Sequence, residues 1–229
     1  MIAVVIPAAG DGQRFKDAGY TDPKPLIPVL GAPMLDRVLE NVTPKRHASH
    51  SIVIARHDLG YGDTLHLLDH PTAGALDTIL QAAGLIDLAG GLLIANCDQL
   101  CALDVDDLID RGDQHDGAVV TFPSSSPHHS YVETDENGII VRIAEKEVIS
   151  NQAVSGVYYL TRASDFLEIA SDVVRRGLTT QGECYVSLAI AAMIDQAMAL
   201  VAYPAETAIL GTPEDMQRFE VAGNIARAL

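Results

Sequence analysis

Short apolar runs alternate with amphipathic segments along the first half of the chain. The runs are rich in β-branched residues, as is typical of buried parallel strands, and cover residues 2–6, 51–55, 91–95 and 117–122. The segments between them carry apolar residues at helical spacing, over residues 33–42, 74–88 and 104–111. Alternating strands and helices predict an α/β fold of three α/β/α layers, Rossmann-like, with a mostly parallel sheet.

The pattern changes after residue 128. Two strand-like stretches, 131–134 and 139–143, flank Asn137-Gly138, which predicts a hairpin with a two-residue turn. We therefore expect a small antiparallel β insertion here. The remaining pattern predicts a strand over 153–160, a helix over 162–176, an almost fully buried helix over 184–197, and a last helix that Thr212 caps and Pro213 begins.

Length and hydropathy predict one domain that spans residues 1–229. The chain has 229 residues, of which 48% are hydrophobic, enough for a substantial core. It has no apolar stretch of the roughly 18 residues that a membrane span needs, and its first strand lacks the basic flank of a signal peptide. We expect a cytoplasmic protein without a membrane partner. The cysteines, Cys97, Cys101 and Cys184, form no paired framework and are interpreted as packing thiols.

The net charge of −16 argues against nucleic acid as a partner, because binding to a phosphate backbone relies on clustered Lys and Arg. An anionic ligand would have to be held by a few local cations or by a metal ion.

The loop after the first strand, residues 7–15, is a candidate phosphate-binding loop. Gly10 and Gly12 would let backbone N–H groups approach phosphates closely, and Arg14 and Lys24 supply cations nearby. The alternative is a glycine-rich turn whose charged side chains are merely solvated.

Two better-known phosphate-binding loops do not fit. Gly10-x-Gly12-x-x-Phe15 lacks the third glycine of a dinucleotide fold, and no Gly-Lys-Ser/Thr follows. An NAD-dependent oxidoreductase is therefore a disfavoured alternative.

Asp98 follows the strand that ends near Ala95 and should lie at the carboxyl edge of the sheet, where α/β folds bind ligands. A carboxylate there can hold Mg²⁺. The alternative is a residue that caps a helix or shapes a turn.

Taken in order, the motifs resemble those of a known family. PAAGDGQRF, PKPLIPVLGAPML, NCDQ, AEKEVISN, GECYV and LGTPEDM resemble the sugar-phosphate nucleotidyltransferases over nearly the whole chain. The resemblance is strongest to a short bacterial branch associated with capsule and surface polysaccharide synthesis, which includes cytidylyltransferases. It implies the nucleotidyltransferase fold and an Mg²⁺-dependent transfer of a nucleoside monophosphate from an NTP to a small phosphorylated acceptor, with release of pyrophosphate.

The resemblance also implies roles for individual residues. Residues 1–122 would form the nucleotide-binding half and residues 123–229 the acceptor-binding half. Arg14 and Lys24 would neutralise the triphosphate, and Lys146 would grip the acceptor phosphate. The nucleotide-binding residues would be Ala8, Ala9, Gly10, Gly12, His57, Thr72, Gly74, Thr78 and Asn96. Without the resemblance, Gly74 and Thr78 fit ordinary helix-entry chemistry, and Lys146 fits a solvated strand end.

One position departs from the family pattern. Many relatives carry a second metal-binding aspartate two residues before the Gly-Thr of the last motif, where this chain has Ile209. We expect Glu183 to replace it beside Asp98, because a charge at the start of a buried helix is costly without a partner such as Mg²⁺. The alternative is a first-turn acid that the helix dipole favours.

The resemblance leaves several questions open. CTP is the expected donor, ahead of UTP and dTTP, and the acceptor is undetermined among sugar phosphates and other phosphorylated small molecules. The missing carboxylate at Ile209 keeps a noncatalytic, nucleotide-binding regulatory protein as an alternative. The oligomeric state is open, a homodimer included.

Overall fold

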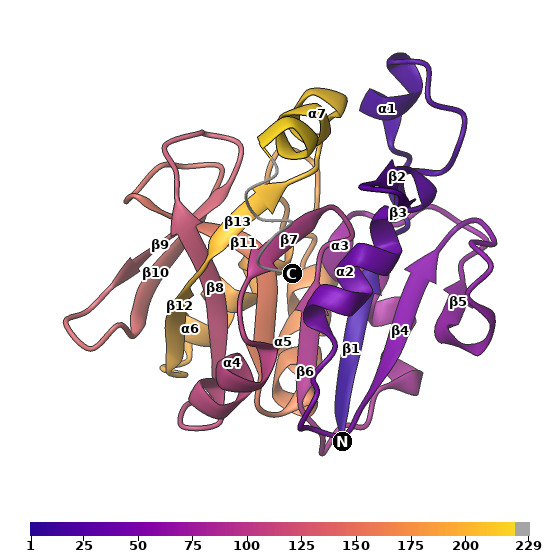
Figure 1. Cartoon of the computed structure of the whole chain (residues 1–229). Helices are drawn as coiled ribbons and strands as arrows, with labels where there is room; N and C mark the ends of the chain where they lie inside the picture. The colour runs from indigo at the N-terminus through magenta and orange to yellow at the C-terminus, as the bar shows by residue number, and fades with distance from the viewer. Residues whose placement is uncertain (223–229) are drawn as a thin grey trace.

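The computed structural model of the chain describes residues 1–222 and confirms the mostly parallel α/β sheet. Its main strands lie side by side in the order β12-β8-β11-β6-β1-β4-β5 (Figure 1). Strands β6, β1, β4 and β5 are mutually parallel, as are β12 and β8, and β11 runs antiparallel between β6 and β8. Their bounds are β1 (Ile2–Pro7), β4 (Ser49–Ala55), β5 (Leu65–Leu67), β6 (Leu92–Ala95), β8 (Gly117–Pro123), β11 (Gln152–Leu160) and β12 (Leu200–Pro204).

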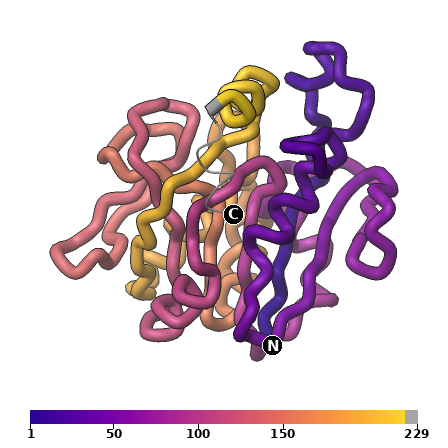
Figure 2. The backbone as a smooth tube through the Cα atoms, in the orientation of Figure 1, coloured from indigo at the N-terminus to yellow at the C-terminus, as the bar shows by residue number. Residues whose placement is uncertain are grey.

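The predicted hairpin is present and extends the sheet at one side. Strands β9 (Ser130–Thr134) and β10 (Ile140–Glu145) pair antiparallel, and the hairpin projects from the body of the molecule (Figure 2). The turn type was predicted wrongly. Asp135 N–H bonds the Ile139 carbonyl and Gly138 has φ +81°, so three residues rather than two form the loop.

Helices cover both faces of the sheet. Alternate residues of β1 divide between the two cores, with Val4 and Ile6 on one side and Ala3 and Val5 on the other. The first core is closed by α2 (Met34–Val42) and α4 (Val105–Gly112), and the second by α3 (Ala75–Gln81), α5 (Ala163–Arg175) and α6 (Val186–Asp195).

Two of these helices are shorter than the sequence pattern predicts. Helix α3 ends at Gln81 and is followed by a separate 3-10 turn, Ala83–Leu85, rather than continuing to residue 88. Helix α6 begins at Val186, not at Cys184. The Cys184 N–H bonds the Ala73 carbonyl, and the Cys184 carbonyl accepts from Leu76 N–H. Because these bonds to a distant segment of the same chain engage its backbone, Cys184 lies outside the helix.

The remaining elements gather mostly above the carboxyl ends of the parallel strands, where Figure 1 shows α1 and α7. Thr212 caps α7 as predicted: its Oγ1 accepts from Asp215 N–H at 3.1 Å. These elements are α1 (Gln13–Asp17), α7 (Pro213–Ala222), the pair β2 (Pro28–Val29) and β3 (Ala32–Pro33), the pair β7 (Gln99–Ala102) and β13 (Glu206–Ile209), and the 3-10 turns Lys24–Leu26 and Gly62–Thr64.

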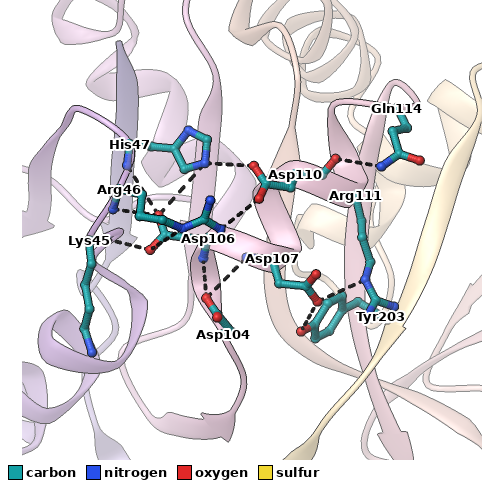
Figure 3. Close-up of polar contacts among 10 residues, drawn as sticks. All are labelled: Lys45, Arg46, His47, Asp104, Asp106, Asp107, Asp110, Arg111, Gln114 and Tyr203. Atoms are coloured by element: carbon teal, nitrogen blue, oxygen red, sulfur yellow. Dashed lines mark hydrogen bonds and ion pairs between the residues drawn. The ribbon is translucent and has the colours of Figure 1, made fainter.

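A buried carboxylate ties α4 to the segment before β4. Asp106 accepts from the backbone N–H groups of Lys45, Arg46 and His47 at 3.0 to 3.3 Å (Figure 3). Burial acts to raise the pKa of Asp106, but these hydrogen bonds outweigh it and lower the pKa below its ordinary value. This contact holds α4 against the segment that leads into β4.

The three cysteines are free thiols. Within residues 1–222, no helix combines the length and apolar character that a membrane crossing requires.

Candidate functional site

A cleft of about 580 Å³ opens at the carboxyl edge of the sheet. It is lined by the loop after β1, the start of α3, the segment after β6 and the turn before α6. It brings together most of the predicted site residues: Ala8, Ala9, Gly10, Gly12, Arg14, Lys24, Thr72, Gly74, Thr78, Asn96, Asp98 and Glu183.

The glycines of the first loop have different reasons to be glycine. Gly12 has φ +62°, and a Cβ added there would lie 3.0 Å from the Lys24 Cβ, so the fold itself requires this close approach. A Cβ added to Gly10 would meet nothing within 4 Å. The packing therefore does not require glycine at this position, and contact of Gly10 with a nucleotide stays a prediction.

Lys24 and Asp98 form an ion pair at the floor of the cleft. The Nζ–Oδ2 distance is 2.5 Å, and the side chains are 15% and 26% exposed. Lys24 Nζ also lies 3.5 Å from the Gly211 carbonyl oxygen and 5.3 Å from the centre of the Phe15 ring. Burial acts to lower the pKa of Lys24, but the Asp98 carboxylate outweighs it and the pKa is raised. The lysine is therefore a fixed cation at neutral pH.

Thr72, Gly74 and Thr78 form one wall of the cleft. The Thr72 and Thr78 hydroxyl oxygens are 2.6 Å apart, and Thr78 donates to the Gly74 carbonyl at 3.0 Å. Gly74 has φ +141°, and a Cβ there would lie 2.6 Å from the Cys184 carbonyl oxygen. The fold alone thus accounts for Gly74 and for the bonds of Thr78, and their contact with a base stays a prediction.

The structural premise for Glu183 was wrong. Glu183 is exposed and lies three residues before α6, in a turn in which Thr180 and Glu183 exchange two backbone hydrogen bonds of 3.0 Å. Neither a buried helix start nor a first-turn acid describes it. The turn nevertheless reaches the cleft, because Cys184 is bonded to the wall at Ala73. A metal-binding role for Glu183 stays a prediction on that ground alone.

Ile209 lies beside Asp98, as the family pattern requires of this position. It pairs with Gln99 between β13 and β7, and the next residue, Leu210, donates its N–H to the Asp98 carbonyl at 2.7 Å. The Asp215 carboxylate lies nearby but outside the cleft lining, where it accepts a hydrogen bond from the Thr212 hydroxyl. A Cβ on Gly211 would lie 3.8 Å from Asp98 Oδ2 and 4.0 Å from Asp215 Oδ2.

Oxygen ligands for Mg²⁺ are present, although too few for a complete coordination shell. Asp98 and Glu183 line one cleft, and carboxylates are the protein ligands that Mg²⁺ takes. Within residues 1–222, no group of three or more His, Cys, Asp or Glu side chains is placed to hold a metal ion. This donor set fits an ion that takes its other ligands from substrate phosphates and water.

Two predicted residues lie outside the cleft lining. His57 is exposed and lines an adjoining cavity of about 250 Å³ behind the first loop, so its contact with a base stays a prediction. Lys146 stands at the end of β10, where its ammonium donates to the Tyr185 hydroxyl. Burial, and then the nearby Glu183 carboxylate, raise the pKa of Tyr185. The phenol therefore remains protonated beside the lysine.

Arg56 is a cleft residue that sequence analysis missed. Its Nε donates to the Ala9 carbonyl at 2.9 Å, and its guanidinium pairs with Asp11. Arg56 directly follows β4, so the argument that places Asp98 at the carboxyl edge would have found it.

Cys97 lines the cleft as a neutral thiol. Burial, assisted by the adjacent Asp98 charge, raises its pKa to about 12. It is neither a nucleophile nor a thiolate ligand at neutral pH.

Comparisons with known proteins agree with this architecture. A family model described as the MobA-like NTP transferase domain matches residues 4–142. A nucleoside-diphosphate-sugar pyrophosphorylase from Vibrio cholerae RC9 superposes with a TM-score of 0.77 at 21% identity, covering 96% of this chain and 100% of that chain. An apo UDP-glucose pyrophosphorylase superposes with a TM-score of 0.79 at 18% identity, covering 99% of this chain and 100% of that chain.

A third solved structure is the inositol-1-phosphate CTP transferase from T. maritima, with a TM-score of 0.68 at 14% identity, covering 93% of this chain and 90% of that chain. At these identities the likeness concerns the fold. No curated protein gives a significant match to the sequence.

Proposed function

The chain belongs to the MobA-like NTP transferase family, a family of nucleotidyltransferases, and we propose that it moves a nucleoside monophosphate from an NTP to a small phosphorylated acceptor, releasing pyrophosphate. The observation that carries the proposal is the cleft itself. It combines a glycine-rich loop, the cations Arg14 and Lys24, and the Asp98 carboxylate at one sheet edge.

In this reaction the acceptor brings its own nucleophile. A phosphate oxygen of the acceptor attacks the α-phosphorus of the NTP, the new O–P bond forms, and the bond to the β-phosphate oxygen breaks. The protein needs no serine or cysteine nucleophile, which accords with the neutral Cys97 thiol. Its task is to position two anions and to stabilise negative charge on the leaving pyrophosphate.

The residues divide this task. The loop from Ala8 to Gly12 would bind the nucleotide, with backbone N–H groups from Ala9 onward as donors because the Ala8 N–H bonds the Ile54 carbonyl. Arg14 and Lys24 would face the triphosphate. Lys146, which follows β10 and contacts Tyr185 just before α6, would hold the acceptor phosphate.

We propose Mg²⁺ as the cofactor, with Asp98 as its principal protein ligand and Glu183 as the second. When bound, the ion would supply positive charge that offsets the repulsion between the two substrates. In the free protein the Asp98 carboxylate is engaged by Lys24, so triphosphate oxygens that attract the lysine would release this carboxylate for the metal.

A pyrimidine NTP is the proposed donor, CTP first. The names of two similar folds support this class: one is an inositol-1-phosphate CTP transferase and another a UDP-glucose pyrophosphorylase. We propose a sugar phosphate or a related phosphorylated small molecule as the acceptor. On motif resemblance we place the product among surface polysaccharide precursors made in the cytoplasm.

The test is a screen for pyrophosphate release with CTP, UTP, dTTP, ATP and GTP against sugar 1-phosphates, inositol 1-phosphate, polyol phosphates and phosphonates. Mg²⁺ is added or removed with a chelator. We expect acceptor-dependent release with a pyrimidine NTP, abolished in Asp98→Asn. That variant, purified in parallel, controls for contaminating phosphatases.

The apolar Ile209 beside Asp98 favours one alternative, a noncatalytic nucleotide-binding protein of the same fold. Calorimetric NTP binding together with no release for any pair would establish this alternative and refute the transferase proposal.

A further inference from the structure

Lys146 has a backbone conformation that lysine rarely adopts. Its φ is +57°, in the left-handed region that is unfavourable for a residue with a Cβ. A hydrogen bond from Lys146 N–H to the His129 carbonyl, 3.1 Å long, holds this conformation. The left-handed conformation of Lys146 turns the chain sharply at the end of β10. The local structure thus fixes where the lysine side chain leaves the strand.

The far end of the same side chain is held by Tyr185. The Lys146 ammonium donates to the Tyr185 hydroxyl oxygen and lies 4.5 Å from the centre of the Tyr185 ring. An ammonium group has three N–H donors, so one bond to Tyr185 leaves two for another acceptor. A free lysine side chain loses much rotamer entropy when it is ordered. A lysine that is already ordered avoids much of this loss when a ligand binds.

Tyr185 is itself fixed to the cleft. It is the last residue before α6, and the backbone of the preceding residue, Cys184, is bonded to Ala73 in the cleft wall. A second contact runs alongside: Ser187 in the first turn of α6 donates to Glu145 at 2.5 Å. Two adjacent side-chain pairs therefore join the end of β10 to the start of α6.

We propose that Tyr185 is the positioning residue of the acceptor site, which holds the Lys146 ammonium so that its two remaining donors face the phosphate or phosphonate of the acceptor. This inference rests on the proposed function, because it takes Lys146 to bind that anion. Tyr185 acts through Lys146 and through no contact with the reacting atoms.

Tyr185→Phe is the first test because it keeps the ring and removes only the hydroxyl. We expect the acceptor KM to rise about 3- to 10-fold, which matches the net contribution of one typical hydrogen bond. The NTP dissociation constant from calorimetry should stay within twofold of wild type. Tyr185→Leu, which also removes the ring, should raise the acceptor KM further.

Tyr203→Phe is the matched control. Its hydroxyl donates to Asp107 at 2.9 Å and the Arg111 guanidinium lies 4.9 Å from the centre of its ring, in the network on α4 (Figure 3). The same atom is removed from a tyrosine that also lies beside a cation, away from the cleft. We expect the acceptor KM of this variant to equal that of wild type.

A double-mutant cycle with Lys146→Ala separates positioning from packing. If Tyr185 acts through the lysine, Tyr185→Phe should add nothing to the KM of the Lys146→Ala variant. An equal rise in both backgrounds, or weaker NTP binding in Tyr185→Phe, would overturn the inference.

A readout without turnover completes the test. The rate at which an acylating reagent modifies Lys146, measured by mass spectrometry, should increase at least threefold in Tyr185→Phe and remain unchanged in Tyr203→Phe. An unchanged rate in Tyr185→Phe also overturns the inference. Wild-type enzyme that releases no pyrophosphate with any pair refutes the proposed function, and with it the acceptor role. Turnover with an unaltered KM in Tyr185→Phe refutes the Tyr185 inference alone.

Discussion

Replacing Lys24 with methionine should weaken catalysis and strengthen metal binding at the same time. Lys24 Nζ lies 2.5 Å from Asp98 Oδ2, and the Lys24 side chain is only 15% exposed. Methionine keeps the volume that packs between Gly12 and Phe15 and removes the charge. The free enzyme then presents an Asp98 carboxylate that no ammonium group occupies.

The size of the effect follows from how exposed the pair is. Exposed ion pairs contribute about 0.2–1 kcal/mol, and removing one partner of a fully buried pair costs about 3–5 kcal/mol. With exposures of 15% and 26%, a competition of about 1–2 kcal/mol is expected. A metal ion should therefore bind nucleotide-free Lys24→Met roughly 5- to 30-fold more tightly than wild type. The activation free energy of turnover should rise by about 2–4 kcal/mol, because a cation facing the leaving phosphates is lost.

Titration with Mn²⁺, followed by the electron paramagnetic resonance signal of the free ion, measures this affinity. Lys24→Met/Asp98→Asn should lose the gain. Arg14→Met is the matched control, since Arg14 forms no ion pair within residues 1–222: it should slow turnover without changing Mn²⁺ affinity. Unaltered Mn²⁺ binding in Lys24→Met would show that the ion pair does not compete with the metal. More than about a third of wild-type kcat/KM would show that Lys24 does not stabilise the transition state.

Other substitutions test separate parts of the structure. Glu183→Gln should raise the Mg²⁺ concentration that gives half-maximal rate several-fold, and an unchanged requirement would remove Glu183 from the metal site. Lys146→Ala should raise the acceptor KM about tenfold or more while calorimetry shows unchanged NTP affinity; equal weakening of both contradicts its assignment. Gly74→Ala should lower the free energy of unfolding by about 1–3 kcal/mol, because its Cβ would meet the Cys184 backbone, whereas Gly10→Ala should leave stability unaltered in the same urea titration. Asp106→Asn should lower the free energy of unfolding by about 1–3 kcal/mol at pH 7. Because the folded-state pKa of Asp106 lies below its unfolded value, this stabilisation is complete above the unfolded value and is lost as the pH falls through the folded value, so the two proteins should converge in acid.

The sequence predicted the parts of the fold that local periodicity determines. Strand β1 and helix α2 occur where the apolar spacing placed them, because each buries a continuous apolar face. The orientation of β11 has no local signal, since an apolar strand buried on both faces has the same composition whether it runs parallel or antiparallel. Strands β12 and β13 were missed because they are short and are stabilised by pairing with β8 and β7, which lie far away in the sequence.

The site was predictable where residues directly follow a strand. Asp98 and the first loop meet at the carboxyl edge for this reason, and Arg56 could have been found in the same way. Glu183 was harder, because its neighbours depend on bonds between Cys184 and a loop more than a hundred residues earlier. Tyr185 stands in the GECYV motif, but the motif gives it no role, since a tyrosine before an apolar helix is ordinary until the lysine beside it is known.

The place of β11 also bears on how the chain is made. It lies between β6 and β8, although both are synthesised before it. Until residues 152–160 leave the ribosome, β6 presents one unpaired edge and β8 presents two, because the other partner of β8, β12, is synthesised later still. Open strand edges are prone to pair with other chains. The stretch 4–142 that carries the family match ends before this strand. A nascent chain of that length holds parts of one sheet that β11 has not yet joined, so completion of the fold has to await the later third of translation.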